Sequence, residues 1–161
     1  MSLLFIVDAY NLTHHPAFKP VAQRPLNLVH ALADFIHFKK LIGSSRNRLI
    51  LVFDGYPPAS EALPRKEGLL CVFSKKLEAD QVIGKLVEKA ARPQDLIVVS
   101  DDKQVQLTAR LFKARFLSVR SFIYGAQGQR ARPAQEAETL EPGLSYAKMR
   151  EINEELKKLW F

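Results

Sequence analysis

Three short apolar runs, each ending on an aspartate, constrain the fold of this chain more than any other feature. They are residues 3–8, 49–54 and 96–101, with Asp8, Asp54 and Asp101 as their last residues. Runs rich in branched side chains and without polar alternation are typical of strands that are covered on both faces in a parallel sheet. Because parallel strands share one direction, their carboxyl ends form one rim, where open α/β sheets bind ligands. We therefore predict that the three aspartates gather on that rim.

Carboxylates that gather at one edge repel each other unless a proton or a cation neutralises them. A divalent cation with oxygen ligands would do so, and such cations are typical of phosphate chemistry. Aspartate also ends strands for a simpler reason, because its side chain accepts hydrogen bonds from nearby backbone amides in turns. The pattern thus indicates a metal site and leaves the turn-only interpretation open.

The rest of the chain alternates helical and strand patterns, as an α/β domain does. Apolar periodicity predicts helices over residues 25–42, 78–91, 103–113 and 145–159, and two more strands at 69–73 and 115–119. Pro, Gly and polar residues predict loops at 11–24 and 123–143. We expect one three-layer α/β domain over residues 1–161, with a mostly parallel sheet of about five strands between helices.

The charge of the chain favours a polyanionic partner. The net charge is +7 and the sequence pI is about 9.6, and such a balance attracts polyanions through counterion release and long-range steering. An acidic rim on a basic protein is a nuclease-like pattern. No Gly-rich phosphate loop or dinucleotide fingerprint follows any strand, which argues against an NTPase or a dehydrogenase.

The sequence also predicts a cytoplasmic location and no contact with membranes. The longest apolar runs are far too short to span a bilayer, and the first residues lack a basic leader. The single cysteine, Cys71, lies inside an apolar run and has no partner for an internal disulfide. We interpret it as a buried structural thiol.

Two further acids stand close to the predicted rim. Asp80 falls in the first turn of the helix over 78–91, where it either complements the helix dipole or adds a fourth carboxylate to the rim. Asp102 directly follows Asp101, and the side chains of adjacent residues diverge. We therefore predict that Asp101 faces the metal, while Asp102 caps the next helix and remains the alternative ligand.

Several segments resemble one known family in the right order. Residues 7–12 read Val-Asp-Ala-Tyr-Asn-Leu and resemble the Val-Asp-Gly-Tyr-Asn signature that opens the YacP-like NYN family, a branch of the PIN-like nucleases. Residues 52–56 resemble its second strand and turn, and Ala79-Asp80 resembles its helix-start acid. Residues 100–122 resemble its closing strand–helix–strand segment, and the terminal helix is also similar.

This resemblance implies a Rossmann-like PIN domain and an endoribonuclease that depends on Mg²⁺ or Mn²⁺. It implies catalytic, metal-binding roles for Asp8, Asp80 and Asp101, and it makes Asn11 the active-site asparagine. Asp54 matches an acidic position with a structural or secondary role, orienting the turn that follows it. The implied partner is RNA, either an mRNA or an rRNA, on or off the ribosome.

The chain departs from the family pattern in two places. Ala9 replaces the expected glycine, which only limits backbone freedom. Gln104 stands where many members carry a glutamate, so metal affinity is expected to be lower unless Asp102 compensates.

Basic and aromatic residues near the predicted rim are candidates for RNA contacts. We expect phosphate contacts from some of four cations, with an ordinary solvated side chain as the alternative for each: Lys75, Lys76, Arg46 and Arg65. Tyr10 or Tyr56 is a candidate for stacking on an unpaired base, although tyrosines near strand ends more often pack. His14 and His15 lie in the predicted loop after the first strand, where they are close enough to the rim to contact substrate.

Two other functions compete with the nuclease. One is an RNA-binding module with weak or lost cleavage, which the Gln104 departure permits. The other is a phosphatase of the haloacid-dehalogenase type, which requires a second aspartate two residues after the first. Tyr10 stands at that position, so the phosphatase interpretation loses support.

Overall fold

The computed structural model describes residues 2–19, 28–59 and 62–125, all within one compact unit, Met1–Arg130. The predicted helix over 145–159 and most of the predicted loop over 123–143 lie outside the described residues, as does the start of the helix predicted over 25–42. The prediction of a single domain over residues 1–161 stays a prediction.

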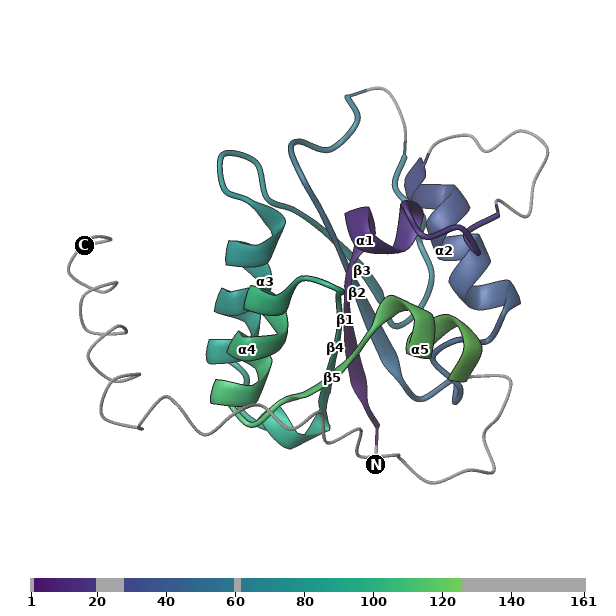
Figure 1. Cartoon of the computed structure of the whole chain (residues 1–161). Coiled ribbons are helices and arrows are strands. Elements are labelled where there is room, and N and C mark those ends of the chain that lie inside the picture. The colour runs from purple at the N-terminus through teal and green to yellow at the C-terminus, as the bar shows by residue number, and fades with distance from the viewer. Residues whose placement is uncertain (1, 20–27, 60–61, 126–161) are drawn as a thin grey trace. The chain divides into compact units, whose positions relative to one another are not determined.

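A five-stranded parallel sheet forms the centre of the described unit (Figure 1). Its order is β3-β2-β1-β4-β5, and all four neighbouring pairs are parallel. The strands are β1 (Leu4–Asp8), β2 (Arg48–Phe53), β3 (Leu69–Phe73), β4 (Leu96–Val99) and β5 (Arg115–Leu117). The predicted fold class is therefore confirmed, with a sheet that is entirely parallel.

Register places the ends of the three central strands level with one another. Val7 of β1 pairs with Leu51 of β2 and with Val99 of β4. The aspartates that follow these pairs therefore leave the sheet at the same edge, which we call the rim. This arrangement is the one that the parallel direction of the strands predicts.

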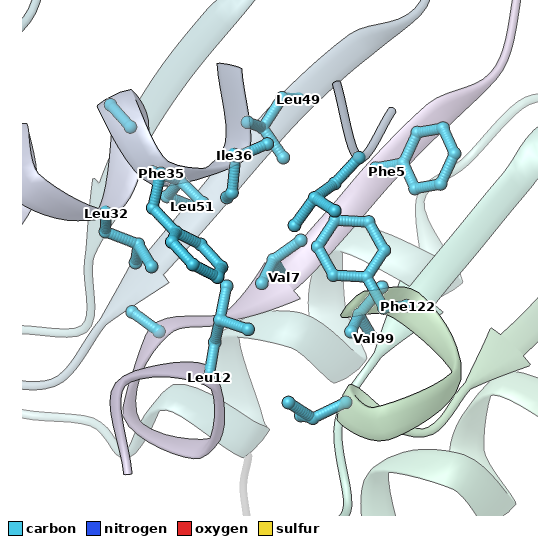
Figure 2. Packing of buried hydrophobic residues seen from close by; sticks show 14 of the residues in the cluster. Phe5, Val7, Leu12, Leu32, Phe35, Ile36, Leu49, Leu51, Val99 and Phe122 are labelled. Atoms are coloured by element: carbon cyan, nitrogen blue, oxygen red, sulfur yellow. The ribbon is translucent and has the colours of Figure 1, made fainter. Parts of the chain in front are cut away.

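Helices cover both faces of the sheet (Figure 1). One face carries α1 (Ala9–Thr13), α2 (Leu28–Phe38) and α5 (Val119–Gly125), and the other carries α3 (Ala79–Glu88) and α4 (Lys103–Leu111). Alternate strand residues point to opposite faces and so feed two separate cores. Figure 2 shows the first core, where strand residues meet α1, α2 and α5 through Phe5, Val7, Leu12, Phe35 and Phe122. The second core joins Ile6, Val52 and Val98 to Ile83 and Val105.

Two short helices correct the predicted loops. Residues 11–24 were expected to be a loop, but α1 begins directly after β1, because the Asp8 side chain accepts the amide of Asn11 and caps the helix. The strand predicted over 115–119 ends at Leu117, and α5 takes the first three residues of the loop predicted from residue 123. The three other predicted helices that the structure describes end two to four residues earlier than expected. In the described part of the chain, no helix has both the length and the apolar character needed to cross a membrane.

Candidate active site

The rim holds an open pocket of about 560 Å³ that is lined mainly by acids. Its lining residues are Asp8, Tyr10, Asn11, Asp54, Glu78, Ala79, Asp80, Asp101 and Asp102. All five aspartates that the sequence singles out, together with Asn11, thus come to one place. The structure brings these residues together, and their metal-binding and catalytic roles stay predictions.

Asp8 is the most buried of these acids, with only 5% of its surface exposed. Its Oδ1 accepts the Asn11 amide at 3.3 Å, and its Oδ2 accepts the Asn11 Nδ2 at 2.5 Å and the Ser100 hydroxyl at 3.3 Å. Burial raises the pKa of Asp8 above its usual range, and the nearby charge of Asp54 adds to this effect. The three hydrogen bonds oppose the rise because they favour the charged form.

Ser100 joins three parts of the site through one hydroxyl group. It is fully buried, and its Oγ accepts the Asn11 Nδ2 at 3.2 Å and the Asp102 amide at 3.1 Å while donating to Asp8. A hydroxyl has one donor and two acceptor positions, so its capacity is filled. Sequence reasoning gave this residue no role in the site, although it belongs to the Ser100-Asp101 pair that resembles the family and is a polar side chain at the end of an apolar run.

The two adjacent aspartates after β4 accept hydrogen bonds from different helices. The Asp102 Oδ1 accepts the amides of Gln104 at 2.7 Å and Val105 at 3.2 Å and so caps α4, as predicted. The exposed Asp101 instead accepts the Val119 amide at 2.9 Å through its Oδ1. Asp101 therefore ties the end of β4 to the start of α5.

Asp54 and Asp80 both contact the start of α3. The Asp54 Oδ1 accepts the Ala79 amide at 2.8 Å, and the Asp80 Oδ1 accepts the adjacent Gln81 amide at 2.6 Å. Asp54 was predicted to orient the turn that follows it, but its side chain holds the start of α3 instead. The turn at Gly55 (φ 79°) is held by the Ser74 hydroxyl, which accepts the Gly55 amide at 3.0 Å.

The pocket carries negative charge that the described part of the protein does not neutralise. The only ion pair among the described residues joins Lys66 to Asp34, away from the rim. Four of the aspartates use one oxygen for backbone amides, and their second oxygen accepts no hydrogen bond from a described residue; they are Asp54, Asp80, Asp101 and Asp102. Carboxylate oxygens that have neither a hydrogen bond nor a counter-charge favour a cation.

Among the described residues, no three His, Cys, Asp or Glu side chains are arranged to hold one metal ion. A cluster of Asp8, Asp80 and Asp101 around a single ion is thus not preformed. Mg²⁺ usually keeps several waters and binds through one or two carboxylates plus the phosphates of its substrate. The hard oxygen donors of this pocket fit Mg²⁺ or Mn²⁺ held in that way, and they do not form a closed protein cage.

The predicted RNA-contacting cations separate into two groups. Lys75 and Lys76 are exposed in the turn between β3 and α3, next to the rim, and Lys75 has a φ of 58°. Arg46 precedes β2 and lies toward the opposite edge, because residues before a parallel strand and residues after it leave the sheet on opposite sides. Arg65 lies in the segment leading into β3 and does not line the pocket.

The predicted aromatic contacts also separate. Tyr10 lines the pocket, is 58% exposed and stacks on the His14 ring with 3.9 Å between ring centroids. Tyr56 is exposed and does not line the pocket.

A parallel α/β sheet that gathers aspartates at its carboxyl-end rim is the architecture that the resemblance to PIN-like nucleases predicts. The family model of the YacP-like NYN domain matches residues 5–160, so the chain belongs to this family. The resemblance predicted from the sequence is therefore confirmed.

Solved structures agree with this assignment. The crystal structure of Rae1 (YacP) from Bacillus subtilis is similar to this chain with a TM-score of 0.56 and 20% identity, over 99% of this chain and 82% of that one. A mutant form of the same protein gives a TM-score of 0.55 and 20% identity, over 99% and 84%. At this identity the likeness shows the fold. No curated protein matches the chain.

Proposed function

We propose that this protein is an endoribonuclease that hydrolyses RNA phosphodiester bonds at the acidic pocket with the help of Mg²⁺ or Mn²⁺. The observation that carries the proposal is the group of five rim aspartates, none of which has an ion-pair partner among the described residues. A protein with a net charge of +7 that keeps one pocket strongly acidic is suited to a polyanionic substrate held by a cation.

The roles of the acids follow from their surroundings. Asp101 and Asp80 would hold the ion through the oxygens that accept no backbone amide, and the more buried Asp8 would hold it directly or through one of the waters that the ion keeps. When bound, the ion would acidify a water for in-line attack and stabilise the charge that develops on the phosphoryl group. Asp54 and Asp102 would mainly fix the starts of α3 and α4.

Asn11 and Ser100 act as positioning residues for Asp8. Their donors hold the Asp8 carboxylate in one orientation and favour its ionised form against the cost of burial. Lys75 and Lys76 stand beside the pocket and would contact phosphates that flank the cleavage point. We place this reaction in the cytoplasm, on an mRNA or an rRNA.

The test compares RNA cleavage by the wild type, Asp8→Asn and Asp101→Asn in the presence of Mg²⁺ or Mn²⁺. Structured and unstructured RNAs are both needed, since the substrate class is open. Asp95→Asn is the matched control, because Asp95 precedes β4 at the edge opposite the rim. We expect metal-dependent products from the wild type and the control, and at least a hundredfold slower cleavage by the two rim variants. Equal cleavage by all four proteins would refute the catalytic assignment.

A second function is favoured by one observation. The lack of a preformed three-ligand cluster among the described residues suits an RNA-binding module with weak or lost cleavage. Tight RNA binding by the wild type, with no products at any Mg²⁺ or Mn²⁺ concentration, would select this alternative.

A further inference from the structure

A second pocket, of about 340 Å³, lies apart from the acidic one and is lined by His15, Arg120 and Tyr124. His15 follows the end of α1, while Arg120 and Tyr124 lie four residues apart on α5, so their side chains share one face of that helix. Both helices lie on the same face of the sheet (Figure 1). The pocket thus forms where segments more than a hundred residues apart come together.

Backbone contacts link this pocket to the acidic one. Helix α1 is capped by Asp8, and α5 begins at Val119, whose amide donates to the Asp101 Oδ1 at 2.9 Å. Arg120 is the next residue in the chain, one Cα step of about 3.8 Å from Val119. A polymer that crosses the acidic pocket at Asp101 is therefore close to Arg120.

The lining groups offer three kinds of contact. Arg120 is exposed and forms no ion pair with a described residue, so its guanidinium is available to an anion. Tyr124 is 51% exposed and meets the His15 ring edge-on, with 6.4 Å between centroids and 67° between planes. The His15 Nδ1 accepts the Ala17 amide at 3.1 Å, so the neutral ring carries its proton on Nε2 and offers a donor.

We propose that this second pocket binds one unpaired nucleotide of the RNA next to the scissile phosphate. Arg120 contacts its phosphate, Tyr124 stacks on its base, and His15 braces the tyrosine and donates to a nucleotide oxygen. The proposal rests on the proposed function, because it takes RNA as the polymer. An unpaired nucleotide is required because a base offers its face to an aromatic side chain only when it is splayed out of a helix.

The test measures RNA binding without divalent metal, so that it does not depend on cleavage. The probe is a fluorescein-labelled oligouridylate of about ten nucleotides, within the site sizes of single-strand binders, and its affinity is measured by anisotropy over a range of salt concentrations. Arg120→Gln should weaken binding and reduce the slope of log K against log salt by about 0.7, the value for one phosphate contact in a single strand. Tyr124→Leu should weaken binding about tenfold, as loss of one stacked base does, with the slope unchanged.

Two variants serve as matched controls. Arg92→Gln removes the same charge before β4, at the edge opposite the rim, and Phe38→Leu removes an exposed aromatic ring at the end of α2. Both should bind the oligouridylate as the wild type does. The same RNA annealed to its complement should bind Tyr124→Leu and wild type equally, because its bases are stacked and paired.

The outcomes separate this proposal from the proposed function. Equal losses for Arg120→Gln and Arg92→Gln, or an unchanged affinity for Tyr124→Leu, would overturn the nucleotide pocket even if Asp101→Asn abolishes cleavage. Unimpaired cleavage by Asp101→Asn, with binding still weakened by both pocket variants, would overturn the catalytic assignment and leave the nucleotide pocket standing.

Discussion

Replacing Ser100 by alanine should destabilise the protein more than any other single-atom change at the rim. The substitution deletes one hydroxyl oxygen from a fully buried position and adds no bulk. It removes a donor to the Asp8 carboxylate and an acceptor for the Asn11 side chain and the Asp102 amide. Three groups, in β1, in α1 and at the cap of α4, thus lose a partner together.

Ser74 gives a reference for the size of this effect. It is 4% exposed, and its hydroxyl accepts one hydrogen bond, from the Gly55 amide at 3.0 Å. Ser74→Ala should therefore cost about 1 kcal/mol, the net worth of one neutral hydrogen bond. Ser100→Ala loses two neutral hydrogen bonds and one hydrogen bond to a charged group, and a bond of the charged kind is worth about 1.5 kcal/mol or more. The three bonds are 3.1–3.3 Å long, so each contributes less than a bond of ideal length. We expect a cost of roughly 2–3 kcal/mol.

Urea unfolding of the wild type, Ser100→Ala and Ser74→Ala at neutral pH measures both values, with equal m-values as the condition for comparing them. The expected order is a loss at least twice as large for Ser100→Ala. If Ser100→Ala costs no more than Ser74→Ala, then the hydroxyl does not join the three groups and the account of how Asp8 is positioned is wrong.

Three further predictions address other residues of the rim. Burial raises the pKa of Asp8, so the unfolded chain releases this proton at a lower pH than the folded protein does. The wild type should therefore lose stability relative to Asp8→Asn as the pH rises from about 3.8 through the folded pKa. Urea titrations at several pH values check the sign of this change. Asp102→Ala removes the cap of α4 and should cost about 1 kcal/mol in urea unfolding, whereas Asp102→Asn, which keeps the capping oxygen, should cost little. Lys75 has a φ of 58°, so Lys75→Gly should stabilise the protein by about 1 kcal/mol in the same assay, while the adjacent Lys76→Gly should not.

The convergence of the aspartates was predictable because it follows from strand direction alone. Apolar runs without alternation indicate parallel strands, and parallel strands place Asp8, Asp54 and Asp101 at one edge regardless of how the helices pack. The capping of α4 by Asp102 was also predictable, because aspartate is a preferred residue directly before a helix. The contact of Asp101 with the Val119 amide was not predicted.

The features that sequence reasoning missed depend on contacts between distant segments. Helices α1 and α5 have five and seven residues, too few for an apolar period to stand out, and Asp8 and Asp101 fix their starts. The three partners of Ser100 cannot be read from its place at the end of an apolar run, because they come from segments that only the fold brings together. The position of Arg46 before a strand did contain the information that it leaves the sheet away from the rim, but residue type alone had suggested an RNA contact.

Most of the rim aspartates use one oxygen to hold a backbone amide and leave the other without a hydrogen bond from a described residue. An asparagine in place of one of these aspartates would still accept the backbone amide with its single carbonyl oxygen, but it would lose the second carboxylate oxygen and the negative charge. Inactivation of this site is therefore a short mutational step that leaves the domain folded. Under the proposed function, family members that keep the fold and bind RNA without cleaving it are therefore expected to arise by drift.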